Sequence, residues 1–396
     1  MRIVVIGGAG AMAKTVIQDL SENPGVKEIL IADYDEKKAL ESAVSYKDAR
    51  IKGAFVDGYE IEKTAELIKG YDIVVNSAQH YINIPVMKAC LRSGCHYNDL
   101  GGLFYGTIEQ KKLFDDFKKS GINAVLCIGG APGITNVLAR YAYDRLDEVE
   151  TVSLSDAAVD MTDMKGIDVF MPGYSIRTIM EEYAAQPVEF IDGKLKKLTP
   201  LSGAMDIDFP EPVGRRTCIH TLHSEPATIG ESFKDKGIKE VTWRLSLPPD
   251  FEKKAIFLAS LGFSEDKPID VQGVKIVPRD VIAAIVDKHI KDRTKGVELT
   301  IKDLEILRAQ VIGKKDGKKV EYNVDCTAKT HTRWGCSSGD VCTAVPQSIC
   351  TQMQVRGEIK EPGVWAPEQV IDPEYFFKEL AKREMTFQVT KKEDIA

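Results

Sequence analysis

Two histidines and a glutamate in the middle of this 396-residue sequence are side chains that can transfer protons. His220 and His223 are three residues apart, and Glu225 follows two residues later. An imidazole changes charge near neutral pH, so His223 is a candidate general base and Glu225 a candidate partner for an ammonium group. His220 is a candidate contact for the same substrate. A packed, structural histidine is the alternative at both positions.

A glycine motif near the start of the chain is typical of a dinucleotide site. Gly8, Gly10 and Ala13 match G-x-G-x-x-A between an apolar strand pattern and a helical pattern. Gly8 permits a tight turn, and Gly10 lets the backbone approach a pyrophosphate that lies on the helix N-terminus at Ala11 and Met12. These residues therefore predict a bound nicotinamide dinucleotide.

Two aspartates after the next strands bear on which dinucleotide binds. Asp33 ends the second strand pattern, 23 residues after Gly10, where a carboxylate accepts hydrogen bonds from ribose hydroxyls and repels a 2′-phosphate. This favours NAD, although Lys37 and Lys38 nearby leave NADP possible. Asp57, after the third strand, covers the adenine edge in one interpretation and is an ordinary turn residue in the other.

Three further positions follow strand patterns at the edge where ligands of an open α/β sheet bind. Ser77 and Ala78 come directly after the fourth strand, and their small side chains leave room for the nicotinamide ribose. Asp99 follows a short strand beside Gly101, so it can face the nicotinamide and bind a substrate amine or relay its proton. A loop aspartate that caps the next helix is the alternative for Asp99.

Strand and helix patterns alternate through the first part of the chain. Strands are expected at residues 2–7, 28–33, 54–56, 72–75, 97–98 and 124–128, and helices at residues 11–21, from residue 35, and at residues 61–69, 84–93 and 106–120. Such alternation implies parallel pairing through right-handed crossovers. The first part is therefore predicted to be an α/β unit built on a doubly wound parallel sheet.

After Gly133 the pattern changes to longer strand-like runs. These are residues 150–157, 188–191, 239–247 and 317–327. They suggest a mostly antiparallel sheet with helices on one face, an α+β unit, and residues 341–353 are expected to form a closing helix. The length of the chain and this change in pattern predict more than one domain.

Composition excludes several classes of partner. The 53 basic and 60 acidic residues give a net charge of −7 without a basic run, so neither nucleic acid nor a membrane is an expected partner. No apolar stretch is long enough to span a bilayer, and the start lacks a signal-peptide pattern, so a cytoplasmic protein is expected.

The eight cysteines form no C-x-x-C pair, and His331 with Cys336, Cys342 and Cys350 matches no zinc pattern, so no metal site is expected.

Several motifs, in one order, resemble the saccharopine dehydrogenase / lysine 6-dehydrogenase family. They include KACLRSG at residues 88–94, HYNDLGG at 96–102, GAPGITN at 130–136, SIRTIMEEY at 175–183, VPQSI at 345–349 and GVWAPE at 363–368. The resemblance covers most of the chain. It implies an NAD(P)-linked oxidation of a carbon–nitrogen bond in a small amino-acid derivative.

The same resemblance implies a domain organisation. It comprises an N-terminal Rossmann domain, an inserted α+β domain for substrate binding and dimerisation, and a C-terminal segment that packs back on the first domain. We place these parts at residues 1–130, 131–338 and 339–396, and we expect a homodimer.

An amino-acid substrate presents a carboxylate, which a guanidinium binds with two hydrogen bonds. Arg244 lies in a strand pattern whose alternation allows it to face either side of a sheet, and it is the candidate for this contact. Tyr174 and Ser175 are candidate hydrogen-bond partners of the substrate. The resemblance adds Pro132 and Gly133 to the substrate-binding residues.

The resemblance leaves the substrate open. Lysine, saccharopine and a carboxynorspermidine-type polyamine derivative all fit an amine that is oxidised to an imine and then hydrolysed. Arg177 departs from the family pattern by adding positive charge within the motif at 175–183, which unsettles the choice. A non-catalytic NAD-binding sensor or scaffold is the alternative from another class.

Overall fold

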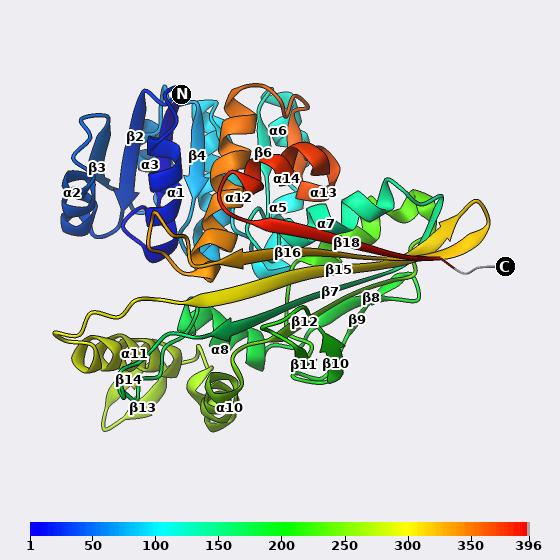
Figure 1. The fold of residues 1–396 in the computed structure, drawn as a ribbon. Coiled ribbons are helices and arrows are strands. Elements are labelled where there is room, and N and C mark those ends of the chain that lie inside the picture. Colours follow the sequence, from blue (N-terminus) through cyan, green and yellow to red (C-terminus); the bar gives the residue numbers. More distant parts are fainter. Residues whose placement is uncertain (394–396) are drawn as a thin grey trace.

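The computed structural model describes residues 1–393 and contains two seven-stranded sheets, one above the other in Figure 1. All strands of the first sheet are parallel, in the order β3-β2-β1-β4-β5-β6-β17. Their bounds are β1 Arg2–Ile6, β2 Glu28–Asp33, β3 Ile51–Phe55, β4 Ile73–Asn76, β5 His96–Asp99, β6 Asn123–Val125 and β17 Gly363–Trp365. The order reverses between β1 and β4, the point where ligands of open α/β sheets bind.

Helices cover both faces of the first sheet because its strands are apolar on both sides. Ile3 faces one core with side chains of α1, α2 and α12, and Val4 faces the other with side chains of α3, α4 and α6. The bounds are α1 Ala11–Ser21, α2 Glu36–Ser45, α3 Ile61–Leu67, η1 His80–Ile82, α4 Asn83–Ser93, α5 Leu103–Lys111, α6 Phe114–Lys119 and α12 Ser338–Val355. The predicted doubly wound sheet is confirmed, although the helix expected over 106–120 is divided into α5 and α6.

The second sheet is mixed and has the strand order β18-β16-β15-β7-β12-β8-β9. Only the β7–β12 pair is parallel, and the other pairs are antiparallel, which agrees with the α+β unit expected from the sequence. The bounds are β7 Glu148–Asp160, β8 Val188–Ile191, β9 Lys194–Lys197, β12 Glu240–Ser246, β15 Asp303–Lys315, β16 Lys318–Lys329 and β18 Thr386–Glu393.

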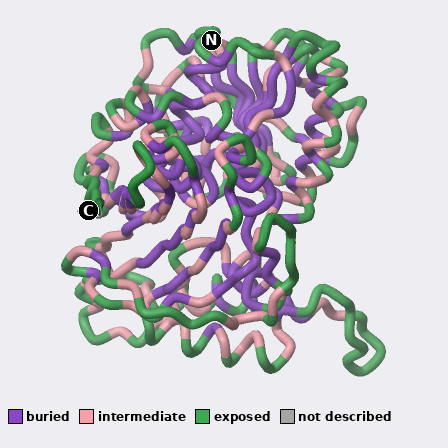
Figure 2. Tube along the Cα trace, turned by 90° about the vertical axis from the view of Figure 1, so that its right-hand side faces the viewer, coloured by how far each residue is buried: buried purple, intermediate pink, exposed green. Residues whose placement is uncertain are grey.

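Shorter elements surround this sheet. They are α7 Ile134–Tyr143, α8 Ile176–Ala184, η2 Glu225–Ala227, α9 Ile229–Ser232, η3 Lys234–Lys236, α10 Pro249–Leu258, η4 Ala259–Phe263, α11 Pro278–Arg293, α13 Pro367–Val370 and α14 Pro373–Ala381, with the hairpins β10 Met205–Asp208 to β11 Arg215–Cys218 and β13 Ile269–Val271 to β14 Val274–Ile276. Figure 2 shows that buried backbone follows the strands, whereas the loops at the periphery are exposed.

Alternation along the central strands gives the second sheet two different faces. Leu154 of β7, Trp243 of β12 and Leu307 of β15 pack in one core with side chains of α7, α8 and α12; we call this the inner face. The neighbouring Ser155, Arg244 and Arg308 line the opposite side, the outer face. Because side chains alternate along a strand, every second residue belongs to the inner face.

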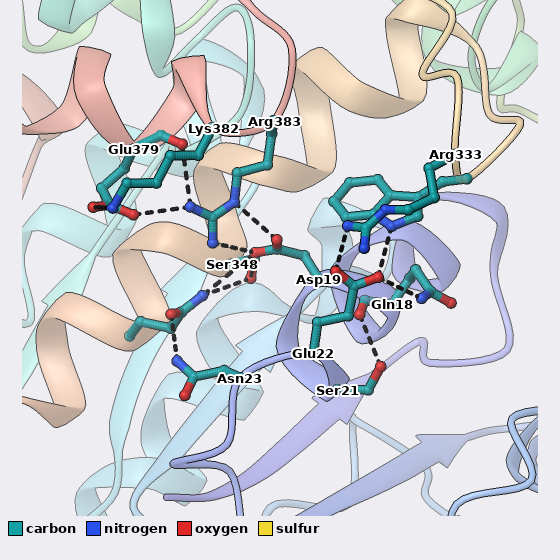
Figure 3. Close-up of polar contacts among 12 residues, drawn as sticks. Gln18, Asp19, Ser21, Glu22, Asn23, Arg333, Ser348, Glu379, Lys382 and Arg383 are labelled. Atoms are coloured by element: carbon teal, nitrogen blue, oxygen red, sulfur yellow. Dashed lines mark hydrogen bonds and ion pairs between the residues drawn. The ribbon is translucent and has the colours of Figure 1, made fainter.

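The last part of the chain joins the two sheets. Strand β17 pairs with β6 in the first sheet, and β18 pairs with β16 in the second. Figure 3 shows how α1 is connected to α12 and to the turn after α14: the Asp19 carboxylate accepts hydrogen bonds from Arg383 at 2.9 and 3.2 Å and from Ser348 at 2.5 Å. The predicted domain boundaries at residues 130 and 338 stay a prediction.

Within residues 1–393, no helix is both long enough and apolar enough to cross a membrane. The same part of the chain contains no group of three or more His, Cys, Asp and Glu side chains arranged to hold a metal ion. All eight cysteines are free thiols, and all except Cys336 are buried.

Candidate active site

The glycine loop between β1 and α1 is shaped for close approach of a ligand. Gly7 has φ +70°, and a Cβ there would lie 2.7 Å from Cα of Ala78. A Cβ on Gly8 would lie 2.8 Å from the Val5 carbonyl oxygen, so both positions require glycine. Gly10 caps α1, whose first turn, from Ala11 and Met12 onward, carries no acidic residue. The positive helix N-terminus therefore fits the pyrophosphate of a dinucleotide.

The two aspartates predicted to face the adenosine end make local contacts. Asp33 accepts a hydrogen bond from the backbone N–H of Ala9 at 3.1 Å, which ties the end of β2 to the glycine loop. Asp57 accepts one from the backbone N–H of Tyr59 at 3.0 Å, the contact of an ordinary turn residue. Lys38 pairs with Asp35 at 3.2 Å. The choice between NAD and NADP stays a prediction.

Ser77 and Ala78 lie where β1 and β4 diverge, together with a residue that the sequence did not single out. The Ser77 hydroxyl donates to Oε1 of Gln347 at 2.8 Å, and Nε2 of Gln347 donates to the Asn76 carbonyl at 3.0 Å. Gln347 belongs to α12, so the closing helix supports the predicted nicotinamide end. Gln347 lies within the VPQSI motif, which indicates the family but does not predict this contact.

His223 is the centre of a buried group of charged and aromatic side chains. Its Nδ1 lies 2.8 Å from Oε2 of Glu225, its Nε2 lies 3.7 Å from Oε1 of Glu182, and its ring stacks on Trp243 at 4.1 Å between centroids. Burial alone lowers the pKa of His223, but the Glu225 and Glu182 carboxylates outweigh it and raise that pKa. The structure therefore brings the predicted His223 and Glu225 together.

Glu182 of α8 is the residue of this group that sequence reasoning missed. It accepts a hydrogen bond from the Tyr174 hydroxyl at 2.5 Å. Burial raises the pKa of Glu182 to about 7, although His223 and Tyr174 lower it. The only signal was its place within the motif at 175–183, because no spacing links it to residue 223.

Contacts connect the predicted nicotinamide end to the His223 group. Gln79, next to Ala78, donates from Nε2 to the Ser175 hydroxyl oxygen at 3.4 Å. Ser175 caps α8 and follows Tyr174, the partner of Glu182. Both predicted residues, Tyr174 and Ser175, therefore lie between the Rossmann sheet and His223.

The loop containing Pro132 and Gly133 supports Glu225. Gly133 has φ +133° and packs so closely that a Cβ would lie 2.0 Å from the Gly129 carbonyl oxygen. This turn starts α7, where the Thr135 hydroxyl donates to Oε1 of Glu225 at 3.0 Å. A helix N-terminus stabilises an adjacent carboxylate, so the loop holds Glu225 as the partner of His223.

Asp99 is completely surrounded by donors. Oδ1 accepts from the backbone N–H groups of Gly101 and Cys127, both at 2.9 Å, and Oδ2 accepts from the hydroxyl of Tyr97 at 2.9 Å and Nε2 of Gln110 at 2.5 Å. Burial raises the pKa of Asp99, while these four donors lower it. The contacts hold Asp99 under the loop after β5, and the structure does not bring it to His223, so its predicted catalytic role stays a prediction.

His220 and Arg244 are also separated from His223. Nδ1 of His220 lies 2.9 Å from both Oε1 of Glu189 and the Trp243 carbonyl, so its donor is used within the sheet. Arg244 follows Trp243 directly and therefore lies on the outer face, where Nε donates to the Gly203 carbonyl at 3.0 Å. The sequence left the face of Arg244 open, and the structure places it on the side away from His223.

The departure at Arg177 has a local partner. Its guanidinium pairs with the Asp280 carboxylate of α11. The positive charge that complicated the prediction of the substrate is therefore neutralised by an ion pair between α8 and α11.

Two family models match this chain over almost all of its length. The saccharopine dehydrogenase NADP binding domain matches residues 3–125, and the saccharopine dehydrogenase C-terminal domain matches residues 129–385. With the glycine loop described above, this match shows that the chain binds NAD(P).

Among curated proteins, carboxyaminopropylagmatine dehydrogenase of Synechocystis sp. is 24% identical over 396 residues, with 96% of each chain covered. Carboxynorspermidine synthase of Vibrio cholerae is 24% identical over 409 residues, covering 94% of this chain and 93% of the relative. These two relatives are similar along their whole lengths.

Two solved structures share the complete fold. Saccharopine dehydrogenase (L-Glu forming) from Saccharomyces cerevisiae superposes with a TM-score of 0.73 at 17% identity, covering 98% of this chain and 99% of that one. Homospermidine synthase from Legionella pneumophila, in complex with NAD, has a TM-score of 0.73 at 12% identity, covering 98% and 91%. At these identities the likeness shows the fold alone.

Proposed function

This chain belongs to the saccharopine dehydrogenase family, and from that premise we propose that it is an NAD(P)-dependent oxidoreductase acting on the C–N bond of a carboxylated polyamine. The observation that carries the proposal is His223, held between Glu225 and Glu182 and stacked on Trp243. Asymmetry in its contacts defines its role. Nδ1 is hydrogen-bonded to Glu225, whereas Nε2 is 3.7 Å from Glu182, which is too long for a hydrogen bond.

Nε2 of His223 and the Glu182 carboxyl group are therefore the two groups available to take a proton from a substrate amine. An ammonium nitrogen has no lone pair, so it must lose a proton before the neighbouring carbon can lose a hydride. A nicotinamide dinucleotide held at the glycine loop would supply the hydride acceptor for this oxidation and the hydride donor for the opposite direction. Because the pKa of Glu182 is about 7, its carboxyl group can accept and release a proton near neutral pH.

The complete reaction balances as an oxidation followed by hydrolysis. The ammonium nitrogen gives a proton to the protein and the carbon next to it loses a hydride, which NAD(P)⁺ would accept, so a protonated imine is left. Water then adds to the imine carbon, the C–N bond breaks, and a carbonyl compound and an amine are released. In reverse, the same residues join an amine to a carbonyl compound.

The acidic character of the site favours a polyamine over saccharopine. Saccharopine carries three carboxylates and requires several arginines, yet Arg244 lies on the outer face and Arg177 is paired with Asp280. The carboxyl groups of Glu182 and Glu225, which surround His223 beside Trp243 of the inner face, are acidic instead. Carboxyaminopropylagmatine dehydrogenase and carboxynorspermidine synthase, the two relatives, are both named for carboxylated amines, which supports the same substrate class. A lysine-like substrate, with one carboxylate, is the second candidate.

The test is reduced-dinucleotide formation by the purified full chain with carboxynorspermidine, saccharopine or lysine, each with NAD and with NADP. Turnover of carboxynorspermidine well above the other two supports the proposal. Turnover of saccharopine or lysine alone overturns the substrate class. Tight NAD(P) binding without turnover of any substrate supports the sensor alternative. The homodimer and the cytoplasmic location expected from the sequence stay predictions.

A further inference from the structure

Two carboxyl groups on the inner face have no part in the reaction just described. Asp156 lies on β7 and Glu305 on β15, and in the register of these strands Leu307 is opposite Asp156 while Ala158 is opposite Glu305. Asp156 and Glu305 are thus diagonal neighbours on one face, close enough for their side chains to hydrogen-bond. Asp156 is only 9% exposed.

The pair has no basic partner. Among the described residues, no Lys, Arg or His forms an ion pair with Asp156 or Glu305, and Oδ1 of Asp156 is buried without any hydrogen-bond partner. A buried acceptor of this kind is uncommon, because leaving it unpaired costs free energy. Burial raises the pKa of both carboxyl groups, and the neighbouring Glu305, Glu225 and Glu182 raise that of Asp156 further.

The pair lies at a distance from the predicted nicotinamide end. A side chain added at Gly339 would come within 3.6 Å of Oε2 of Glu305, whereas Gln347 contacts Ser77. Both residues belong to α12, and eight residues of α-helix span about 12 Å. A nitrogen bound at the pair is therefore not the nitrogen next to the carbon that gives up a hydride.

We propose that Asp156 and Glu305 bind a second, non-reacting cationic nitrogen of the substrate. This inference rests on the proposed function, and it defines the substrate as an amine with at least two positive charges several bonds apart. An ammonium group supplies donors to the unpartnered Oδ1 of Asp156 and to Glu305 together. The described residues offer no third His, Cys, Asp or Glu to make this a metal site, so an organic cation fits the pair better.

Proton release on binding is a consequence that can be measured. Other carboxyl groups act on the pair from four elements: Glu182 of α8, Glu225 of η2, Asp303 of β15 and Asp340 of α12. This negative surrounding favours the protonated form of the pair when no cation is present. A bound ammonium group favours the ionised form of both carboxyls, so binding should release a proton.

The first experiment measures binding of norspermidine, a triamine without a carboxylate, to the full chain saturated with NAD or, in parallel, with NADP. Calorimetry in two buffers of different ionisation enthalpy reports affinity and proton release together. Asp156→Asn and Glu305→Gln, on different strands, should each weaken binding roughly 10- to 100-fold and reduce the proton release. Ser155→Ala, the adjacent residue on the outer face, is the matched control and should bind like the wild type. Unchanged binding in both acidic variants, with their thermal unfolding intact, would overturn the inference.

The second experiment separates this inference from the proposed function. Two substrates with the same reacting C–N bond are compared, carboxynorspermidine and an analogue in which an alkyl group replaces the distal amine. Asp156→Asn should raise KM for carboxynorspermidine roughly 10- to 100-fold and leave KM for the analogue unchanged. Equal effects on both substrates overturn the inference while the function stands. No turnover, with norspermidine binding still lost in Asp156→Asn, overturns the function and supports the pair only as a binding site for a cationic nitrogen.

Discussion

The two faces of the second sheet are built from alternate residues of the same three strands, yet their charges are arranged in opposite ways. On the outer face, Arg308 is paired with Asp325 by hydrogen bonds of 2.6 and 2.8 Å, and Arg244 donates to backbone and hydroxyl oxygens. On the inner face, Asp156 and Glu305 have only each other. The charged groups of the outer face are paired within the protein, whereas the described residues give Asp156 and Glu305 no basic partner.

The comparison distinguishes charged groups that stabilise the fold by pairing with each other from charged groups that remain free to bind a ligand. A buried pair such as Arg308–Asp325 holds strands together, and its groups are no longer free to bind a substrate. An acidic face with a single imidazole is stable only when protons or a cationic ligand neutralise it. The inner face therefore carries the chemistry, and the following predictions compare the two faces.

Removing the imidazole of the inner face should have the largest effect. His223→Asn keeps a polar side chain but removes the imidazole, the group that accepts the substrate proton. We expect kcat to fall about 100- to 10,000-fold, the usual contribution of general base catalysis, with NADP affinity unchanged. Initial rates and a fluorescence titration with NADPH measure the two effects. A kcat within threefold of the wild type would show that His223 is not the proton acceptor.

On the outer face, breaking the buried ion pair should destabilise the fold without slowing the reaction. Arg308→Ala leaves the Asp325 carboxylate, 6% exposed, without its partner. The expected loss is about 3–5 kcal/mol in the free energy of unfolding, measured with urea. The remaining folded enzyme should keep its kcat, and a fall in kcat as large as that of His223→Asn would remove the distinction between the faces.

The raised pKa of Glu182 predicts a pH dependence specific to the inner face. Between its unfolded value of about 4.3 and its folded value of about 7, the folded state holds a proton that the unfolded chain has lost, so stability falls as pH rises. The Glu182→Gln variant has no titratable group at this position, so its stability does not fall for this reason as pH rises. Relative to the wild type, it should therefore gain up to about 3 kcal/mol between pH 4.5 and 7. Urea unfolding at several pH values measures the difference, and parallel curves for the two proteins would contradict the assignment.

The smallest effect is expected for the arginine that the sequence offered as the carboxylate partner. Arg244→Ala removes a side chain of the outer face whose contacts are with Gly203 and Thr242. Both kcat and KM should change about twofold or less, as for substitutions away from a site. A large rise in KM for the carboxylated substrate would restore the original interpretation of Arg244.

The first sheet, the glycine loop and the pairing of His223 with Glu225 could be predicted from short stretches of sequence. The glycine loop was predictable because its function depends on residues within one turn, and His223 and Glu225 because they are two residues apart. Glu182, Asp156 and Glu305 were not, since they come from α8, β7 and β15 and meet only through the register of the second sheet. Strand β17 was missed because it has only three residues, and β18 because its partner β16 is distant in sequence, whereas β15 was missed although it forms a hairpin with β16.

The alternation of side chains along β12 explains why the sequence did not predict the face on which Arg244 lies. From the sequence, Arg244 was free to face either side, and only the packing of Trp243 against His223 fixes its direction. A shift of one residue in β12 would exchange the tryptophan and the arginine between the faces. The side chain that binds substrate therefore depends on strand register, which one sequence does not reveal.

The most direct test of this account is an experimental structure of the full chain with NADP and carboxynorspermidine bound. We expect the reacting nitrogen of the substrate to lie beside Nε2 of His223 and the Glu182 carboxyl group. A distal nitrogen should contact Asp156 and Glu305 on the inner face. A substrate bound on the outer face at Arg244 and Arg308, or one that leaves the His223 group without contact, would contradict it.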